Sequence, residues 1–429
     1  MRYWWLVPAL APAFGMPQPA VLDSAEAGRV FAMAADLVAT EAGRLWGRSL
    51  GGPLLIVDRR TGTTWANEAD PSGALQSIGG GISRGRLPAS INPANTAVTY
   101  AGKRWTMVVW PLPVDSGARR QLLAHELWHR IQDSLGLPMN NPNNGHVDRE
   151  AGRVWLRLEA RALARALEST GTERVEALID ALSFRQARVD GHPAADSAEA
   201  LLERNEGLAE YTGLVASGRT AADQRAVAAR ALRLMEDRPT LARSFAYSNG
   251  PAYGLLLDDL RPGWRLELRS GAGPARLAAR ATGVRFRVGP DLVATEARYE
   301  GPVVRAAEAD RAAKREARRK ELVGLLITGP ILTFPLIKAE FAFDPNRVES
   351  LDSLGTVYGG LRLSDQWGVL DVTTGTGRVA ANYQSATVPV GPGFDPAKPA
   401  GPGWRIDLAR GWRVVADSGR GRWRLAPPR

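Results

Sequence analysis

The sequence predicts an α+β protein, in which a domain with a small β-sheet and several helices is followed by a smaller β-rich domain. Short apolar runs bounded by turn residues occupy 53–110, and an alternation of apolar and polar residues returns after about 325. Between these two regions, much of 116–260 follows the apolar period of helices. The 45 glycines and 29 prolines supply the many turns that such an arrangement needs.

The N-terminal part of the chain is predicted as one helix followed by strands. The helix covers 25–46 and is amphipathic and rich in alanine. Gly79, Gly80 and Gly81 form a predicted loop, and Tyr100–Lys103 forms a predicted hairpin turn. The predicted strands are 53–58, 63–66, 96–100 and 104–110.

Helices are predicted for most of the central part. The period becomes helical from about Ser116 to Leu135, where Leu123, Leu127 and Ile131 form one stripe. A loop rich in proline and asparagine follows at 138–145. Four more helices are then predicted, at 148–169, 172–188, 196–217 and 220–236.

The last third of the chain is predicted as a β-like segment at 264–299, a charged helix at 303–323 and a β-domain at 325–429. The stretch 305–321 holds seven basic and four acidic residues, which favours a solvated helix with i,i+4 pairs over a binding patch. The expected divisions of the chain are therefore 1–20, 21–262, 263–324 and 325–429.

The N-terminus is predicted as a signal peptide over 1–20. Arg2 precedes the apolar run Tyr3–Phe14, which contains the small-residue pattern Ala11-Pro12-Ala13. We therefore expect export to the periplasm or the medium. A buried N-terminal strand is the alternative, and a cytoplasmic location stays open. No run in the sequence approaches the roughly 18 uncharged apolar residues of a membrane-spanning helix, so no integral membrane segment is expected.

The charge and cysteine content exclude several classes of site. The net charge is +10, but the basic residues are scattered and are not gathered beside aromatic residues, so no nucleic-acid partner is expected. The chain contains no cysteine, which rules out disulfides and thiolate metal sites. The oligomeric state cannot be inferred from the sequence.

The segment His125-Glu126-Leu127-Trp128-His129 is the strongest chemical signal. On a helix, His125 and His129 are one turn apart, so both imidazoles can reach one cation. Glu126 lies beside them, where it can take a proton from a water on the metal. Two of the four histidines of the chain fall in this HExxH pattern. The sequence therefore predicts a Zn²⁺ site.

A catalytic zinc needs a third protein ligand, which we expect to be a carboxylate. His146 and His192 stay possible, but both lie in segments predicted as loops. The segment Asn205-Glu-Gly-Leu-Ala-Glu-Tyr-Thr-Gly213 resembles the EGxAxY segment of the gluzincin metallopeptidases. That resemblance makes Glu206 the ligand. Gly207 would be costly inside a helix, so it suggests that another element passes close by.

The same resemblance leaves one alternative ligand and suggests further site residues. In gluzincins the glutamate ligand usually comes from the first helix after the histidines, which here would make it Glu159. If Glu206 is the ligand, Glu159 would instead hold a histidine in place. Tyr247 and Tyr253 are the candidates to stabilise the oxyanion, with Tyr211 as a third.

The resemblance implies a zincin-like catalytic domain and a zinc metallopeptidase that acts on a peptide or protein substrate. Glu126 would be the general base, and the strand 104–110 would border the cleft and pair with an extended substrate. No GxMEN-like segment is present, so an aminopeptidase is not expected. The alternatives are a zinc hydrolase of another amide or ester, and a catalytically inactive binding protein on the same scaffold.

Overall fold

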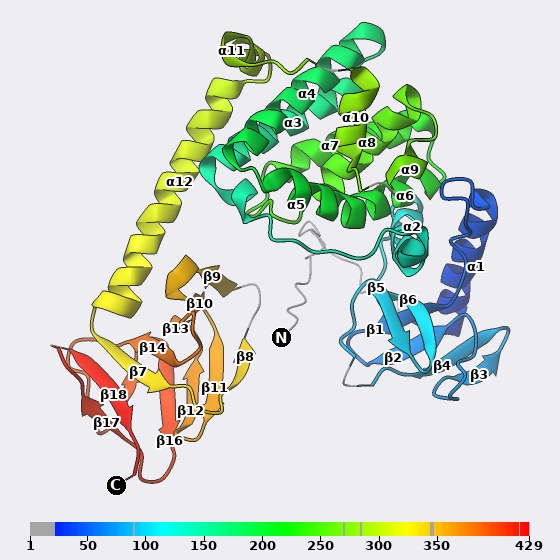
Figure 1. Ribbon diagram of the computed structural model, residues 1–429. Coiled ribbons are helices and arrows are strands. Elements are labelled where there is room, and N and C mark those ends of the chain that lie inside the picture. Colours follow the sequence, from blue (N-terminus) through cyan, green and yellow to red (C-terminus); the bar gives the residue numbers. More distant parts are fainter. Residues whose placement is uncertain are drawn as a thin grey trace. The chain divides into compact units, whose positions relative to one another are not determined.

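The computed structural model describes residues 22–88, 91–268, 271–283, 285–343, 347–419 and 421–428 (Figure 1). The chain divides into two compact units, Met1–Glu308 and Ala309–Arg429. The predicted signal peptide lies outside the described residues. Within these residues, no helix combines the length and the apolar character needed to cross a membrane.

The first unit begins with helix α1 (Ser24–Glu41) and a six-stranded sheet in the order β3-β4-β2-β1-β6-β5. Strands β1 and β6 are parallel, and the other neighbours are antiparallel. The strands are β1 (Leu54–Asp58), β2 (Thr63–Ala66), β3 (Gln76–Gly79), β4 (Ile82–Arg86), β5 (Thr96–Tyr100) and β6 (Lys103–Trp110).

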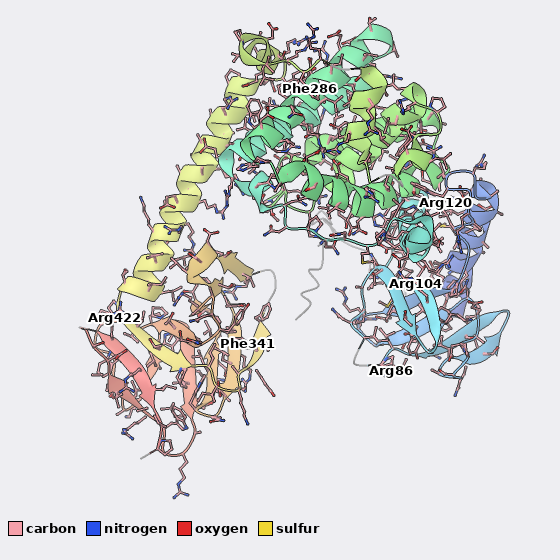
Figure 2. All side chains as sticks on the ribbon, viewed as in Figure 1. Arg86, Arg104, Arg120, Phe286, Phe341 and Arg422 are labelled. Atoms are coloured by element: carbon pink, nitrogen blue, oxygen red, sulfur yellow. The ribbon has the colours of Figure 1, made fainter. Side chains whose placement is uncertain are left out.

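One face of this sheet packs against helices. Ile56 of β1 and Val108 of β6 share a buried core with Val30 of α1 and with Leu123, which lies on the helix that follows β6. Arg120 of that helix donates from Nη1 to Oδ2 of Asp36 on α1 (2.7 Å), so α1 and the helix after β6 are also joined at the surface (Figure 2). The sheet thus supports the helix that carries the two histidines.

The strand predictions hold for β1, β2, β5 and β6, and two strands were missed. Strands β3 and β4 flank the predicted glycine loop of Gly79–Gly81 and pair with each other. All four residues of β3 are exposed, so this edge strand has no apolar face that alternation could reveal.

The helical part of the first unit contains α2 (Ser116–Ile131) and seven further helical segments that follow it closely. All of them contribute to one buried apolar core except the π-helical turn η3. Four of the five residues of η3 are buried as well. These segments are α3 (Glu150–Glu168), α4 (Gly171–Gly191), α5 (Ala195–Leu202), η3 (Glu203–Gly207), α6 (Leu208–Ala216), α7 (Ala221–Met235) and α8 (Ala246–Leu260). Short 3₁₀ turns lie at Gln132–Leu135 and Gly145–Asp148.

The prediction of a β-like segment at 264–299 is wrong. The described residues there form helices α9 (Trp264–Glu267), α10 (Pro274–Thr282) and α11 (Gly289–Arg298). Helix α10 has Pro274 in its first turn and ends at Gly283, whose φ is 59°. Proline and glycine, which also bound strands, here start and stop a short helix.

The charged helix was predicted correctly. It is α12 (Gly301–Val323), and the π-helical turn η5 (Gly324–Thr328) follows it. Most of its side chains from Ala309 onward are exposed, which fits a solvated helix.

The second unit confirms the predicted β-rich C-terminal region. A seven-stranded sheet has the order β17-β18-β7-β14-β13-β10-β9, and a five-stranded sheet has the order β15-β16-β12-β11-β8. Phe334 and Val388 of the first sheet share one core with Leu363 and Leu370 of the second, so the two sheets enclose an apolar centre. The strands are β7 (Ile331–Pro335), β8 (Glu340–Phe343), β9 (Val348–Ser350), β10 (Thr356–Tyr358), β11 (Leu361–Asp365), β12 (Gly368–Val372), β13 (Gly377–Val379), β14 (Ser385–Pro389), β15 (Ala400–Gly401), β16 (Trp404–Leu408), β17 (Arg413–Ala416) and β18 (Arg422–Ala426).

Candidate metal centre

Helix α2 places two histidines and a glutamate on its buried side. His125 and His129 are one turn apart and project from the same face, as the sequence spacing predicts. Leu127 and Trp128 belong to the helical core, and Leu123 packs onto the sheet. The helix is therefore fixed on both sides, which gives the two imidazoles a rigid base.

Glu206 approaches the histidines from η3, the π-helical turn between α5 and α6. Turns of this kind are rare and occur often at functional sites. Gly207 in this turn lies against Gly250 of α8, and a Cβ added to Gly250 would come within 2.3 Å of the Gly207 Cα. The expectation that another element passes close to Gly207 is confirmed.

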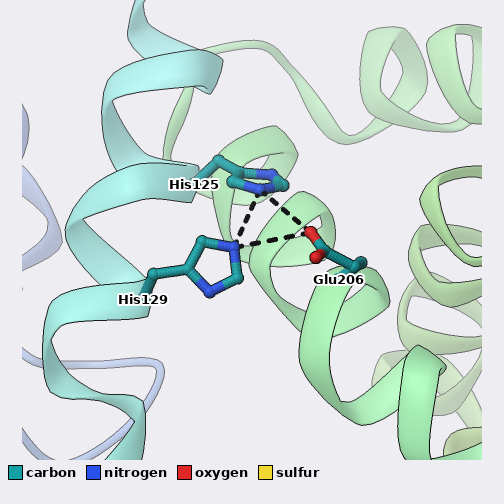
Figure 3. A group of neighbouring side chains, drawn as sticks. All are labelled: His125, His129 and Glu206. Carbon is teal, nitrogen blue, oxygen red and sulfur yellow. Dashed lines mark hydrogen bonds and ion pairs between the residues drawn. The ribbon is translucent and has the colours of Figure 1, made fainter. Parts of the chain in front are cut away.

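The three side chains converge on one point (Figure 3). The two Nε2 atoms of His125 and His129 lie 3.1 Å apart, and Oε2 of Glu206 lies 3.7 Å from the first and 3.6 Å from the second. Ligands at zinc-like bond lengths in a tetrahedron would be about 3.3 Å apart. The cluster, which we call the metal-binding cluster, therefore has the dimensions needed to hold one metal ion.

Hydrogen bonds fix which imidazole nitrogens face this point. Nδ1 of His125 lies 2.7 Å from Oε2 of Glu210, a carboxylate that can only accept. Nδ1 of His129 lies 2.5 Å from Oε1 of Gln132, whose Nε2 donates to the Leu137 carbonyl (3.0 Å). Both Nδ1 atoms therefore carry a proton, and the two Nε2 atoms face each other. Such a pair is repulsive unless a cation or a proton lies between them.

The carboxylates around the cluster set its protonation. Burial alone would lower the pKa of His125, but hydrogen bonds with Glu206 and Glu210 hold it well above its ordinary value. Burial would likewise raise the pKa of Glu206, but hydrogen bonds with His125 and His129 hold it well below its ordinary value. Glu206 is therefore ionised, which is the form that could bind a metal ion.

Glu126 is a buried carboxyl group beside the cluster. Its Oε1 lies 3.9 Å from Nε2 of His125, and its Oε2 has no hydrogen-bond partner among the described residues. The residue is only 4 % exposed, and burial raises the pKa of its carboxyl group, against the opposing effect of His125 and His129. A buried carboxyl group of raised pKa beside a metal-binding cluster is suited to proton transfer.

Tyr247 lies at the cluster, as predicted. Its hydroxyl donates to Oε2 of Glu206 (2.6 Å), and its ring stacks on His125 with a centroid separation of 5.8 Å. Burial, together with the charge of Glu206, raises the pKa of Tyr247 well above its ordinary value, so the hydroxyl stays a donor.

Glu159 and Tyr253 are placed elsewhere. The hydroxyl of Tyr253 donates to Oε1 of Glu159 (2.7 Å), and this carboxylate also pairs with Arg188 (2.6 Å). Neither residue belongs to the metal-binding cluster found among the described residues. We call their group the buried ionic cluster; it consists of Glu159, Arg185, Arg188, Glu199, Glu203 and Tyr253.

The other tyrosine and histidine candidates also have different partners. The hydroxyl of Tyr211 donates to Asp258 of α8 (2.7 Å). Nε2 of His146 lies 2.7 Å from Oε1 of Glu199, at the border of the buried ionic cluster, and His192 lies against His146 with their rings 5.7 Å apart.

Sequence reasoning missed four residues that contact the cluster. Glu210 and Gln132 orient the histidines, and Asn205 and Arg243 donate to Oε1 of Glu206 from 3.2 Å and 3.0 Å. Helical spacing could have indicated the first two, because Glu210 follows Glu206 by one turn and Gln132 follows His129 by one turn. No local signal indicates Arg243, since it lies in the segment that precedes α8.

No protein-family model matches this chain, and no curated protein or solved structure matches it either.

Proposed function

We propose that this chain is a zinc-dependent metallopeptidase of the gluzincin type, with His125, His129 and Glu206 as the zinc ligands. The observation that carries this proposal is the convergence of two imidazole Nε2 atoms and an ionised carboxylate beside a buried Glu126, whose Oε2 has no hydrogen-bond partner among the described residues. A pair of imidazoles with one carboxylate is a ligand set of catalytic zinc sites.

Bound zinc would supply Lewis-acid polarisation of the scissile carbonyl and of the attacking water. Glu126 is the residue that moves protons. Its raised pKa brings the carboxylate closer to the working pH, where a general base is most effective. Glu126 takes a proton from the attacking water and then passes it to the leaving amine. At the end of the reaction, Glu126 is therefore in the protonation state in which it started.

Tyr247 supports the same reaction as a hydrogen-bond donor. Its hydroxyl donates to Oε2 of Glu206 (2.6 Å), and it would turn this proton to a substrate carbonyl oxygen that is brought to the cluster. A fixed donor at this position would stabilise the negative charge that develops on that oxygen.

The first test is zinc content, measured by elemental analysis of the purified full chain after zinc is supplied. We expect about one zinc per wild-type chain, and we expect the zinc to be lost in Glu206→Ala and His129→Ala. Glu159→Ala is the matched control, because it removes a buried glutamate from the buried ionic cluster. Circular dichroism verifies that each variant is folded.

Two results would contradict the proposal. Folded wild-type protein that takes up no zinc would remove the metal, and retention of zinc in Glu206→Ala with loss in Glu159→Ala would move the ligand to α3. Hydrolysis is then measured on a pool of peptides, with release of a new amino terminus as the signal.

A further inference from the structure

Arg243 and Asn141 form a polar rim beside the metal-binding cluster. Arg243 donates from Nη2 to Oε1 of Glu206 (3.0 Å) and from Nη1 to Oδ1 of Asn141 (3.1 Å). The side chain of Arg243 is 37 % exposed, whereas that of Glu206 is 9 % exposed. Asn141 is exposed as well. A molecule that approaches Glu206 from this side therefore meets the guanidinium first.

The carboxylate of Glu206 does not depend on Arg243 for its hydrogen bonds. Oε2 accepts from Tyr247 and faces the two histidines, and Oε1 also accepts from Nδ2 of Asn205 (3.2 Å). A neutral amide and a hydroxyl thus already serve both oxygens. The positive charge of Arg243 is additional, and its Nε has no hydrogen-bond partner in the described part of the chain.

A metal ion held by Glu206 would change the balance of charge at this rim. The carboxylate would then share its charge with the metal, and the half-exposed guanidinium would lie beside a cation with donors to spare. Guanidinium groups bind carboxylates through paired hydrogen bonds, and such charge-assisted bonds are stronger than neutral ones. An anion from the substrate would satisfy this geometry.

We propose that Arg243 is a substrate-binding residue that takes a carboxylate, so that the substrate carries a carboxylate close to the bond that is cut. This inference rests on the proposed peptidase function and names its substrate class. Arg243 lies one hydrogen bond from a metal ligand, and consecutive residues of a peptide are 3.8 Å apart. The carboxylate therefore lies within about two residues of the scissile bond.

This carboxylate has two sources in a peptide. It is the α-carboxylate of the C-terminal residue, if the enzyme cuts near the end of the chain, or the side chain of an Asp or Glu beside the bond. The chemistry at Arg243 is the same in both, and the substrates separate them.

The experiment uses the zinc-loaded full chain and three pools of N-acetylated, randomised pentapeptides. The first pool has a free C-terminus and no acidic residue, the second is amidated without acidic residues, and the third is amidated and contains one Asp or Glu. Mass spectrometry measures the products. We expect cleavage of the first or the third pool at least about tenfold faster than that of the second.

Variants of Arg243 link this preference to the residue. In Arg243→Gln, KM for the preferred pool's best peptide should rise about tenfold to a hundredfold with a smaller change in kcat, and Arg243→Lys should restore part of the loss. The matched control is Arg233→Gln, which removes an arginine that pairs with Glu168. This control should keep wild-type values.

The outcomes separate this inference from the proposed function. Equal cleavage of all three pools, with Arg243→Gln unaffected, would overturn the role of Arg243 and leave the peptidase intact. Loss of zinc from Arg243→Gln would make Arg243 a structural partner of Glu206 and would also overturn the inference. If the zinc-loaded wild type cleaves none of the pools, the proposed function itself fails.

Discussion

Two buried polar clusters each include a glutamate of the π-helical turn η3. Glu206 in η3 belongs to the metal-binding cluster, and Glu203 in the same turn belongs to the buried ionic cluster. In the ionic cluster, each carboxylate faces a guanidinium: Arg185 pairs with Glu203 (2.7 Å), and Arg188 pairs with Glu199 (2.7 Å). In the metal-binding cluster, two imidazole nitrogens face each other instead, at 3.1 Å.

The difference teaches how a structural cluster and a candidate metal site can be told apart. Buried charges are stable when each has a partner of opposite sign, and the ionic cluster meets this condition from within. In the metal-binding cluster the charge of Glu206 has Arg243 as its partner, but the two facing Nε2 atoms need a proton or a metal ion between them. Glu126 adds a second contrast, because its Oε2 lacks a partner, whereas both oxygens of Glu159 are hydrogen-bonded.

The contrast between the two clusters requires that Glu126 has a chemical role. Replacing it in Glu126→Gln should lower peptide hydrolysis by about 10²- to 10⁴-fold while zinc stays bound, because the amide cannot accept the proton of the attacking water. Hydrolysis rates and zinc content are measured on the same samples. Glu168→Gln, at an exposed ion pair, serves as the control. Full activity in Glu126→Gln would mean that Glu126 does not take part in the reaction.

A stability measurement tests the structural role of the ionic cluster. Arg188 is fully buried and pairs with Glu159 and Glu199, so Arg188→Met should lower the free energy of unfolding by about 3–5 kcal/mol, because it leaves buried charges unpaired. Arg165→Met removes an exposed pair with Glu173 and should cost about 0–1 kcal/mol. Urea unfolding measures both. Similar midpoints for the two variants would remove the distinction between the clusters.

The pH dependence of stability sharpens the comparison at Glu203. Burial raises the pKa of this carboxyl group to about 7, and the charges of Glu159 and Glu199 act in the same direction. The charge of Arg185 and its hydrogen bond to Glu203 oppose this rise. The raised pKa means that its contribution to stability is full below about pH 4.5 and is lost as the pH rises to about 7.

Glu203→Gln cannot titrate and should escape this loss. The unfolding free energy of the variant relative to wild type should therefore rise by an amount on the order of 3 kcal/mol between pH 4.5 and 7. Unfolding curves of both proteins across this pH range measure the difference. A constant difference would show that Glu203 stays ionised beside Arg185.

The smallest expected effect concerns the orientation of His129. Gln132→Leu removes the acceptor of the Nδ1 proton and should weaken zinc binding by about 10- to 100-fold. Competition with a chelator of known affinity measures the change. The matched control is Gln186→Leu, because the Gln186 amide only donates to Asp190 on α4. Equal affinities for the two variants would mean that Gln132 does not position the histidine.

Local sequence patterns predicted those parts of the fold in which one face is buried. Strands β1, β2, β5 and β6 and the helices α2 to α7 were recognised in this way. The exposed strand β3 gave no signal, and the short helices α9 to α11 were mistaken for strands because their glycine and proline caps look like turns. The pattern also missed the π-helical turn, whose hydrogen bonds span five residues along the chain instead of the four of an α-helix.

For the site, the sequence by itself determined that His125 and His129 share a helix face with Glu126 beside them, because helical spacing is local. It also indicated from Gly207 that a second element passes close to Glu206. Only the tertiary structure shows that Glu206 and Tyr247, and not Glu159 and Tyr253, lie beside the two histidines. Those positions depend on which helices meet, and here Gly207 and Gly250 let η3 and α8 approach until Glu206 and Tyr247 reach the histidines. The pairing of distant helices is set by the packing of the whole core, which no local pattern encodes.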